Sequence, residues 1–435
     1  MHRGKMSANA SLASENSVGG GTPNACGMSR RGFIQFGGAL ALSVALPLGG
    51  LSALTGCRSA AGDELLLGER TITDHAGREV TVPVASSLER VYFTSALAQV
   101  FVFSLIPQLQ AGTAITFSQQ ELAMMPDYMA DLPNLGSLSS NGEIDREELI
   151  ARDVQVVFSI SGTDLTASNI SEAEKLQDQT GIPVVLIDGS FSRIAEAYRF
   201  LGDILGCADR AEELATYLED VYENVSSAVA TVPESQRVSV YYAEGPLGLQ
   251  TEPDESQHAL AFAVAGAKNV AAVDANQGLG MSNVSLEQVI AWDPEVIVAW
   301  DGAIRGGADE IVRTKDTWAG IRAVKNERVY TMPNAPFAWL DRPPGVNRFI
   351  GIQWLANMLY PDAYDVDMVD VTRDFYSRMY WCDITVDQAL DLLGNSYPPV
   401  GRQAKYTYSG DATHGGSSSS GLSNDALTQR QAGAD

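Results

Sequence analysis

Histidine is scarce in this chain, which has four histidines in 435 residues. Only His75 and His258 fall in the part that we expect to fold, because the other two lie near the ends. A bare zinc or manganese site usually draws on several histidine or cysteine side chains. The scarcity therefore disfavours a bare metal site and favours a ligand that arrives as a complex or as an oxyanion.

Cysteine is equally rare, and its four copies form no Cys-x-x-Cys pair or Cys/His cluster, so a structural zinc site is not indicated. Cys26 and Cys57 belong to the N-terminal region, which leaves Cys207 and Cys382. An exported protein could join these two in a disulfide, but the sequence alone leaves the pairing open.

Positive charge is the third shortage, because 29 lysines and arginines stand against 54 aspartates and glutamates, for a formal net charge of −25. Nucleic-acid phosphates need a basic surface, so this balance argues against a nucleic-acid partner, and solubility is a sufficient explanation for it. The chain also lacks a Gly-x-Ser-x-Gly elbow, a P-loop and a histidine metal motif. We therefore expect a protein that catalyses no reaction. An exported α/β enzyme is the alternative from a different class.

The N-terminus carries an export signal. Residues 29–34 form a twin-arginine pattern, and the uncharged stretch 37–54 follows it. A transmembrane anchor is the alternative, but the glycines and the proline of this stretch make it a weak helix. Residues 54–57 resemble a bacterial lipoprotein box, which implies that Cys57 becomes the lipid-modified first residue. We predict a signal peptide over 1–56, export by the twin-arginine route, and a lipid anchor on the extracytoplasmic face of the membrane.

The ends of the mature chain are predicted to be unstructured. Residues 57–69 are expected to be a tether to the membrane. From about Ser409 the chain is mainly Gly, Ser, Asp, Ala and Gln, which bury too little surface to offset the entropy of ordering. We predict a disordered tail over 401–435. The remaining part, about 330 residues, is long enough for two α/β lobes.

Two stretches of this middle part are near copies of each other. The first, 147–157, reads EELIARDVQVV, and the second, 287–297, reads EQVIAWDPEVI. Both patterns predict a short helix, a tight turn and a buried strand. A single recurrence 140 positions later indicates two similar lobes rather than a solenoid, whose repeats are shorter and more numerous. Two lobes imply a cleft between them, where ligands usually bind.

Strands and helices alternate through both halves, which is typical of parallel sheets covered by helices. Strands are expected at 70–82 (two around a turn), 90–95, 111–115, 154–160, 183–187, 237–242, 295–300 and 328–332. Helices are expected at 96–105, 145–151, 191–205, 210–229, 258–265, 348–358, 371–379 and 385–393. The helix at 210–229 is about 30 Å long and lies between the repeats. We interpret it as a rigid connector, and a helix that covers one lobe is the alternative.

Both repeats begin with a helix-capping pattern. Asp145 and Ser285 are the expected N-caps, with a Glu or Gln three residues later closing a capping box. Glu147 and Glu287 then fall at the second helical position, which the cap does not use. They either complement the helix dipole or present one exposed carboxylate on each lobe to a basic partner.

Several motifs carry a family resemblance. Residues 73–83 (TDHAGREVTVP) with 89–91 (ERV), residues 265–271 (AGAKNVA) and residues 285–298 are similar to the iron-complex and cobalamin class of ABC-transporter substrate-binding proteins. In the first repeat, Val154 stands where that class usually has proline. The resemblance implies two Rossmann-like α/β lobes joined by a single long connecting helix, with the ligand in a shallow cleft. A long connecting helix also implies little closure.

The same resemblance implies partners and domain boundaries. Glu147 and Glu287 would dock onto arginines of a membrane permease, which works with a cytoplasmic ATPase. The binding protein itself is expected to be a monomer without a cofactor. The expected domains are an N-terminal lobe over 70–190, connecting helices over 191–234 and a C-terminal lobe over 235–400.

A loop after the strand at 328–332 holds the main ligand candidates. Residues 336–348 read PFAWLDRPPGVNR, and such loops bind ligands in doubly wound sheets. Arg342 offers a planar fork for carboxylates or oxyanions, and Trp339 offers a flat apolar face. In the alternative interpretation, Trp339 lies in the core and Arg342 pairs locally with Asp341.

Further candidates stand at strand ends and at a helix start. Tyr92, Tyr241 and Trp300 are candidates to line the cleft, although the two tyrosines could equally be core residues, and His258 begins a helix of the second lobe. These residues do not identify the cargo. We expect an iron complex, with a siderophore first and haem or cobalamin next. Molybdate or tungstate bound through Arg342 is the alternative within the same fold.

Overall fold

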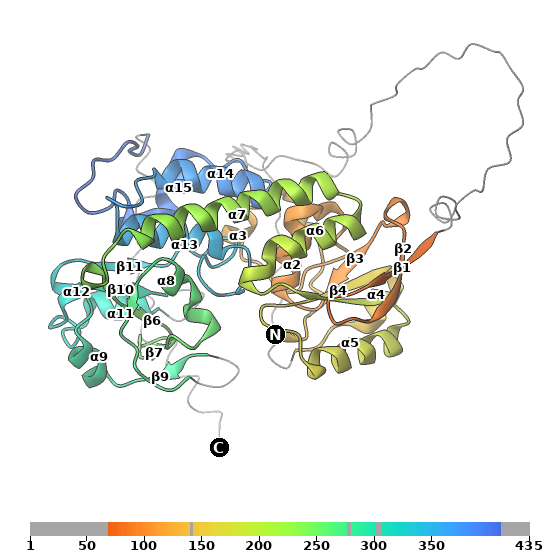
Figure 1. Cartoon of the computed structure of the whole chain (residues 1–435), viewed down its shortest axis with the longest axis horizontal. Coiled ribbons are helices and arrows are strands. Elements are labelled where there is room, and N and C mark those ends of the chain that lie inside the picture. The colour runs from red at the N-terminus through yellow and green to blue at the C-terminus, as the bar shows by residue number, and fades with distance from the viewer. Residues whose placement is uncertain (1–67, 140–141, 276–279, 301–306, 410–435) are drawn as a thin grey trace, which may run out of the picture.

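The computed structural model describes residues 68–139, 142–275, 280–300 and 307–409, which fold into two α/β lobes lying side by side (Figure 1). The two-lobe architecture predicted from the repeat is confirmed. The predicted signal peptide and the lipid site at Cys57 lie outside the described residues. Within the described part of the chain, no helix is both long and apolar enough to cross a membrane.

The N lobe begins with a β-hairpin and continues with a parallel sheet. β1 (Glu69–Thr73) pairs antiparallel with β2 (Glu79–Pro83). The three-stranded sheet has the order β3-β4-β5, with β3 at Val91–Phe93, β4 at Val156–Ser161 and β5 at Val184–Asp188. Every residue of β3 and β5 is buried, as expected for a parallel sheet that is covered on its faces.

The helices of the N lobe are α2 (Ala96–Leu105), α3 (Gln119–Leu122), α4 (Arg146–Ala151) and α5 (Ala167–Thr180). The sequence pattern does not predict α5, because polar residues dominate it and only Ala173 and Leu176 are buried. The strand predicted at 111–115 is wrong, since this segment forms isolated bridges only, such as Thr113 with Asn134.

A pair of helices connects the lobes. α6 (Ile194–Leu205) ends at Gly206, whose left-handed φ of 72° turns the chain into α7 (Ala208–Ala230). α7 has 23 residues, which gives a length of about 35 Å, and it runs along both lobes in Figure 1. It packs on α6 and on α13 (Arg348–Leu359) of the C lobe. The long connecting helix predicted from the apolar spacing is therefore present.

The C lobe is built on a four-stranded parallel sheet of order β11-β10-β6-β8. Its strands are β6 (Ser239–Ala243), β8 (Lys268–Asn269), β10 (Val296–Ala299) and β11 (Val329–Thr331). A separate antiparallel pair joins β7 (Gln250–Thr251) to β9 (Ser282–Asn283). Because the four strands of the sheet are parallel, their carboxyl ends reach the same edge.

The remaining helices of the C lobe are α8 (Leu260–Val264), α9 (Leu286–Trp292), α11 (Ala308–Thr314), α12 (Arg322–Lys325), α14 (Met368–Tyr380) and α15 (Val386–Leu393). α13 is buried along its whole length and forms the centre of this lobe. α14 packs on α2 of the N lobe, and Trp381 Nε1 donates to the Phe103 carbonyl at 3.0 Å. Tertiary contacts therefore hold the lobes together in addition to the connecting helices.

The C lobe extends beyond the boundary expected at residue 400. Lys405 pairs with Asp370 of α14 at 2.6 Å, and Tyr408 donates to Asp391 of α15 at 2.8 Å. Residues 401–409 thus belong to the folded lobe rather than to a disordered tail.

The structure also answers the open question about the two remaining cysteines. Cys207 carries a free thiol, so it does not pair with Cys382. Burial raises the pKa of the Cys207 thiol to about 11, which makes it a poor nucleophile.

Candidate functional site

Polar side chains gather at the carboxyl ends of the C-lobe strands. Glu244 directly follows β6, and Trp300 directly follows β10. Glu252 follows β7, and the loop after β11 carries Asp341 and Arg342. Residues that are far apart in the sequence meet here because parallel strands end at one edge of their sheet.

Arg342 lies at the centre of this group and contacts three carboxylates. Its Nη2 lies 3.3 Å from Glu244 Oε1 and 3.2 Å from Glu252 Oε1, and its Nε lies 3.2 Å from Asp341 Oδ2. The arginine side chain is 20% exposed, whereas the three carboxylates have no exposed surface. The guanidinium also lies over the Trp300 ring, 5.1 Å from its centroid. Arg342 is therefore the member of the group that solvent reaches.

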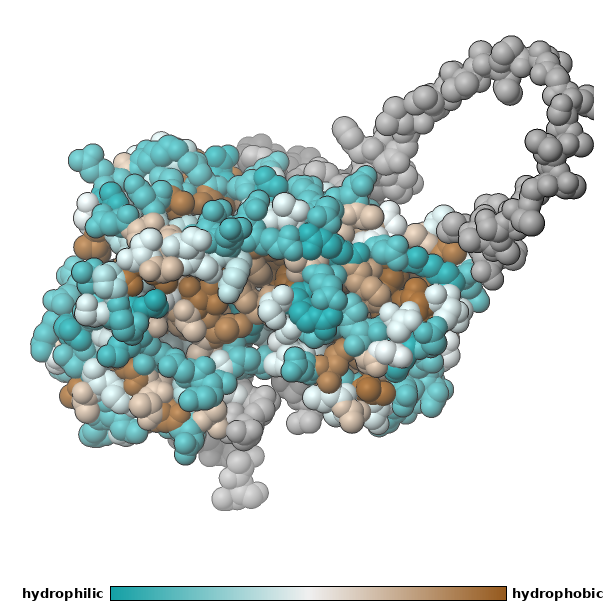
Figure 2. All heavy atoms as spheres, viewed as in Figure 1, coloured by the Kyte–Doolittle hydropathy of each residue, from teal (hydrophilic) through white to brown (hydrophobic). Residues whose placement is uncertain are grey.

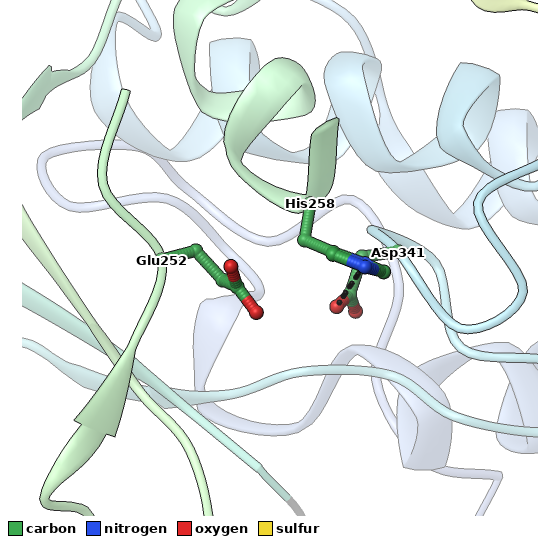
Figure 3. A group of neighbouring side chains, drawn as sticks. All are labelled: Glu252, His258 and Asp341. Atoms are coloured by element: carbon green, nitrogen blue, oxygen red, sulfur yellow. Dashed lines mark ion pairs between the residues drawn. The ribbon is translucent and has the colours of Figure 1, made fainter. Parts of the chain in front are cut away.

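His258 completes the group. It lies in the turn that leads into α8, and its Nδ1 is 3.3 Å from Asp341 Oδ2. Tyr242 donates to the other oxygen of Asp341 at 2.8 Å and accepts from Trp300 Nε1 at 2.7 Å. Figure 3 shows Glu252, His258 and Asp341 as neighbours, and one ligating atom from each lies within 4.8 Å of the others. We call Glu244, Glu252, His258, Asp341 and Arg342 the acidic cluster.

Burial and charge act differently on two carboxyl groups of the acidic cluster. Burial, followed by the charges of Asp341 and Glu252, raises the pKa of Glu244 well above its usual value. Burial alone would also raise the pKa of Asp341, but the contact with His258 at 3.3 Å and the charge of Arg342 outweigh it and lower that pKa. Glu244 therefore favours its protonated form, and Asp341 favours its ionised form.

Some atoms of the acidic cluster are available to a ligand. Among the described residues, Glu244 Oε2, His258 Nδ1 and Asp341 Oδ2 form ion-pair contacts at most and no hydrogen bond. Buried polar atoms normally find hydrogen-bond partners. Besides Glu244, which favours its protonated form, the carboxyls of Glu252 and Asp341 face one guanidinium. Acidic groups therefore still outnumber the guanidinium, and the cluster attracts a cation more readily than an anion. Carboxylate oxygen and imidazole nitrogen are also atoms that bind divalent and trivalent metals.

The loop that carries Arg342 also reaches the N lobe. A Cβ atom built on Gly345 would lie 2.6 Å from a methyl group of Leu97, and one built on Gly162 would lie 3.4 Å from the ring of Pro344. The absence of a side chain at Gly345 lets the lobes approach closely here, whereas a Cβ at Gly162 would make an ordinary van der Waals contact. This contact places the acidic cluster beside the boundary between the lobes, where a cleft ligand is expected.

A separate apolar pocket lies at the same boundary, beneath α7. Its volume is about 210 Å³, and its lining includes Phe191 from the N lobe, Tyr222 from α7 and Phe349 from α13. Phe191 stacks on Phe349 with centroids 4.8 Å apart and meets Tyr222 edge-on at 5.9 Å. Figure 2 shows apolar surface in the middle of this face, between the two halves of the molecule. The pocket belongs to the packing of the connector rather than to the acidic cluster.

The structure brings together three ligand candidates from the sequence, namely Arg342, Trp300 and His258. It places Trp339 elsewhere, because this ring is fully buried and packs edge-on against Trp354 with centroids 6.3 Å apart. The position matches the core alternative for Trp339. The local contact between Arg342 and the preceding aspartate, also left open by the sequence, is present as part of the larger cluster.

The two tyrosine candidates lie in the cores of their lobes. Tyr92 is fully buried and donates to the Thr113 carbonyl at 2.9 Å. Tyr241 is fully buried and donates to the Gly248 carbonyl at 2.8 Å. Each hydroxyl is satisfied inside its own lobe, so neither tyrosine is presented to a ligand in this structure.

Sequence reasoning does not find Glu244 and Glu252. Glu244 has a usable signal, because a carboxylate that directly follows a buried strand lies at the ligand edge of a parallel sheet. Glu252 has no such sequence signal. It follows the two-residue strand β7, and no local pattern predicts that Thr251 of this strand pairs with Ser282.

The two repeated glutamates are exposed at the second position of their helices, Glu147 in α4 and Glu287 in α9. The capping box predicted for both helices forms in α9 only. In α4, Asp145 still caps, but Glu148 pairs with Arg152 at 2.7 Å instead of reaching back. Neither Glu147 nor Glu287 makes an ion pair within the described residues, so both carboxylates are presented to solvent.

Comparison with known proteins supports the same class. Residues 116–336, just over half of the chain, match the model of a family described as "Periplasmic binding protein". The molybdate-binding protein MolA of Haemophilus influenzae is 28% identical over 351 residues, which cover 74% of this chain and 94% of that protein. An uncharacterized ABC transporter substrate-binding lipoprotein of Bacillus subtilis, YvrC, is 25% identical over 45% of this chain and 59% of that protein.

Solved structures share the fold. An ABC transporter solute binding protein from Sulfurospirillum deleyianum has 28% identity and a TM-score of 0.66, covering 75% of this chain and 99% of that chain. MolA bound to molybdate superposes with a TM-score of 0.58 at 23% identity, covering 73% and 99%. At that identity the likeness shows the fold alone.

Proposed function

Because the chain belongs to the periplasmic binding protein family, we propose that it captures a metal complex outside the cytoplasm and delivers it to an ABC importer. The prediction of a transport binding protein rather than an enzyme is confirmed, and the family implies a permease and its ATPase as partners. A ferric siderophore is the first choice of cargo, followed by haem or cobalamin.

The observation that carries the choice of a metal complex is the composition of the acidic cluster. An oxyanion that approached Arg342 would also meet the buried carboxyls of Glu244, Glu252 and Asp341 at 3.3 Å or less from the guanidinium. A metal complex with net positive charge or an open coordination position would instead be attracted by these carboxyls, and His258 adds a nitrogen ligand beside them. The charge balance therefore favours a cargo with a cationic centre.

Molybdate or tungstate is the second candidate. It is supported by the 28% identity to a molybdate-binding protein over 94% of that protein's length. Arg342 would supply the cation for such an oxyanion, since it is the cluster's only fully charged donor and the most exposed of its charged groups.

Calorimetric titration of the purified mature protein distinguishes the two candidates. Separate titrations use sodium molybdate, sodium tungstate, ferric hydroxamate and catecholate siderophores, haemin and cyanocobalamin. Native mass spectrometry with metal analysis of the protein as isolated gives an independent answer. Binding of molybdate at micromolar affinity or better, together with no binding of any metal complex, would refute the first choice.

A charge-neutral variant sharpens this test. Glu252→Gln removes one buried carboxylate, so it should weaken a metal complex but strengthen an oxyanion, each by about ten-fold or more, as expected for a buried charge. Glu255→Gln is the matched control, because Glu255 lies three positions away and is exposed. A Glu252→Gln protein that binds its cargo like the control would show that the acidic cluster does not contact the cargo.

Anchoring and docking complete the proposal. The lipoprotein-like box supports attachment through a lipid on Cys57, and a Cys57→Ser protein should leave the membrane fraction.

The exposed, unpaired carboxylates of Glu147 and Glu287 support docking onto a basic face of the permease. Replacing both by lysine should abolish uptake of the cargo by cells while ligand affinity stays unchanged. Normal uptake by the double variant would contradict the docking role.

A further inference from the structure

Two isoleucines are exposed at equivalent places on the two lobes. Ile150 in α4 is 51% exposed, and Ile290 in α9 is 47% exposed. They are among a handful of large apolar side chains that are exposed in the described part of the chain. Single exposed apolar residues are common on protein surfaces, but these two occupy the same position in a repeated unit.

Each isoleucine lies one helical turn after a repeated glutamate. Residues three apart are neighbours on a helix surface, so Ile150 lies beside Glu147 and Ile290 lies beside Glu287. The residue just before each isoleucine, Leu149 or Val289, is fully buried in its own lobe. The alanine just after each isoleucine is exposed. Each helix therefore turns one carboxylate and one apolar side chain outward together.

The fold does not require isoleucine at these positions. A half-exposed side chain contributes little to the core of its own lobe, and a β-branched residue is a slightly weaker helix former than the straight-chain residues usual on a helix surface. The packing of each lobe therefore does not by itself account for the outward isoleucine. Both helices lie just before a strand of their lobe's parallel sheet, α4 before β4 and α9 before β10, so the two pairs hold equivalent places in the two lobes.

We propose that each lobe docks on the permease through a two-part contact, in which the glutamate meets a cationic side chain and the isoleucine enters an apolar depression beside it. This inference rests on the docking role proposed for Glu147 and Glu287. The net charge of −25 supports a basic partner. The carboxylates steer the encounter, and the isoleucines slow dissociation because they leave water in the docked state.

The test measures docking directly. Biolayer interferometry follows purified mature protein binding to the cognate permease–ATPase complex in nanodiscs, at low and at high sodium chloride. Ile150→Gln/Ile290→Gln should weaken docking about ten-fold, by a similar factor at both salt concentrations. Glu147→Gln/Glu287→Gln should weaken docking at low salt and remove most of its salt dependence.

Two further variants keep the result interpretable. Val400→Gln changes an apolar residue that is 66% exposed elsewhere on the C lobe, and it should dock like the unmodified protein. Ile150→Ala/Ile290→Ala keeps a strong helix former and should give an intermediate loss of docking. Melting temperature and cargo affinity should be unchanged in all of these proteins.

The outcomes separate this inference from the docking role on which it rests. If both isoleucine double variants dock like Val400→Gln while Glu147→Gln/Glu287→Gln loses docking, the apolar half of the contact is refuted and the carboxylate docking stands. If the glutamate double variant also docks normally, both proposals fail. A salt-independent loss in the isoleucine variants with unchanged cargo affinity supports the two-part contact.

Discussion

Replacing Arg342 with alanine removes the cation that three buried carboxyl groups share. The guanidinium nitrogens lie 3.2–3.3 Å from Glu244, Glu252 and Asp341, whose carboxylates have no exposed surface. Removing one partner of a buried ion pair typically costs about 3–5 kcal/mol, because the other charge stays buried without compensation. Glu244 already favours its protonated form, so the cost falls mainly on the other two carboxyls. We expect a loss of about 3 kcal/mol in the free energy of unfolding at pH 7.

The size of this loss should depend on pH in a definite direction. The pKa of Asp341 is lowered in the folded protein. Burial alone would raise this pKa, but His258 and Arg342 together lower it by more. A lowered carboxyl pKa adds stability above the unfolded value, and that stability disappears as pH falls through the folded value. Part of it depends on Arg342, so the difference between Arg342→Ala and the unmodified protein should be largest at neutral pH and should shrink toward pH 4 and below.

Urea unfolding of the cargo-free protein, followed by tryptophan fluorescence between about pH 2.5 and pH 8, measures both quantities. The matched control is Arg199→Ala, because Arg199 also pairs with two carboxylates, Glu212 and Glu219, but with side chains that are 38%, 59% and 52% exposed. Exposed pairs contribute little, so this control should lose about 1 kcal/mol or less. A loss in Arg342→Ala that is no larger than in the control would refute the reasoning about the acidic cluster.

Further predictions concern two other buried groups. The pKa of Glu244 is raised, so its contribution to stability is complete below the unfolded value and is lost as pH rises through the folded value. Glu244→Gln should therefore gain melting temperature relative to the unmodified protein as pH rises from 5 to 8, and parallel profiles would contradict this. Trp339→Ala should lose about 3–5 kcal/mol of stability, since it leaves a cavity in the core beside Trp354. Chemical denaturation measures this loss, and a variant of unchanged stability with weakened cargo binding would return Trp339 to the ligand site.

The architecture follows from sequence patterns because its signals are local and repeated. Residues 145–157 and 285–297 carry the same order of cap, helix, turn and strand, and the structure shows that order in both lobes. The long connector is also visible in the sequence, since its apolar residues recur at helical spacing over 23 residues. α5 is not visible, because with only Ala173 and Leu176 buried it has almost no apolar face.

The site is less predictable because burial decides which of several plausible side chains reach a ligand. Trp339 lies in the loop after β11 and Tyr241 lies within β6, and both carry the right chemistry, yet both are fully buried in packing contacts. Glu252 has no local signal and joins Arg342 only through the fold, across 90 positions of sequence. Arg342 itself is predictable, since proline-rich loops at strand ends are common ligand loops.

The lobes are joined by the 23-residue α7 and are also held by α14, which packs on α2. We expect a molecule tied at both places to keep nearly the same outline whether it is empty or loaded. The distance between α4 and α9 would then tell a transporter little about whether the protein is loaded. A transporter would instead have to distinguish the loaded protein from the empty one by the exposed surface of the cargo at the lobe boundary. The protein would then present its cargo without a change of shape.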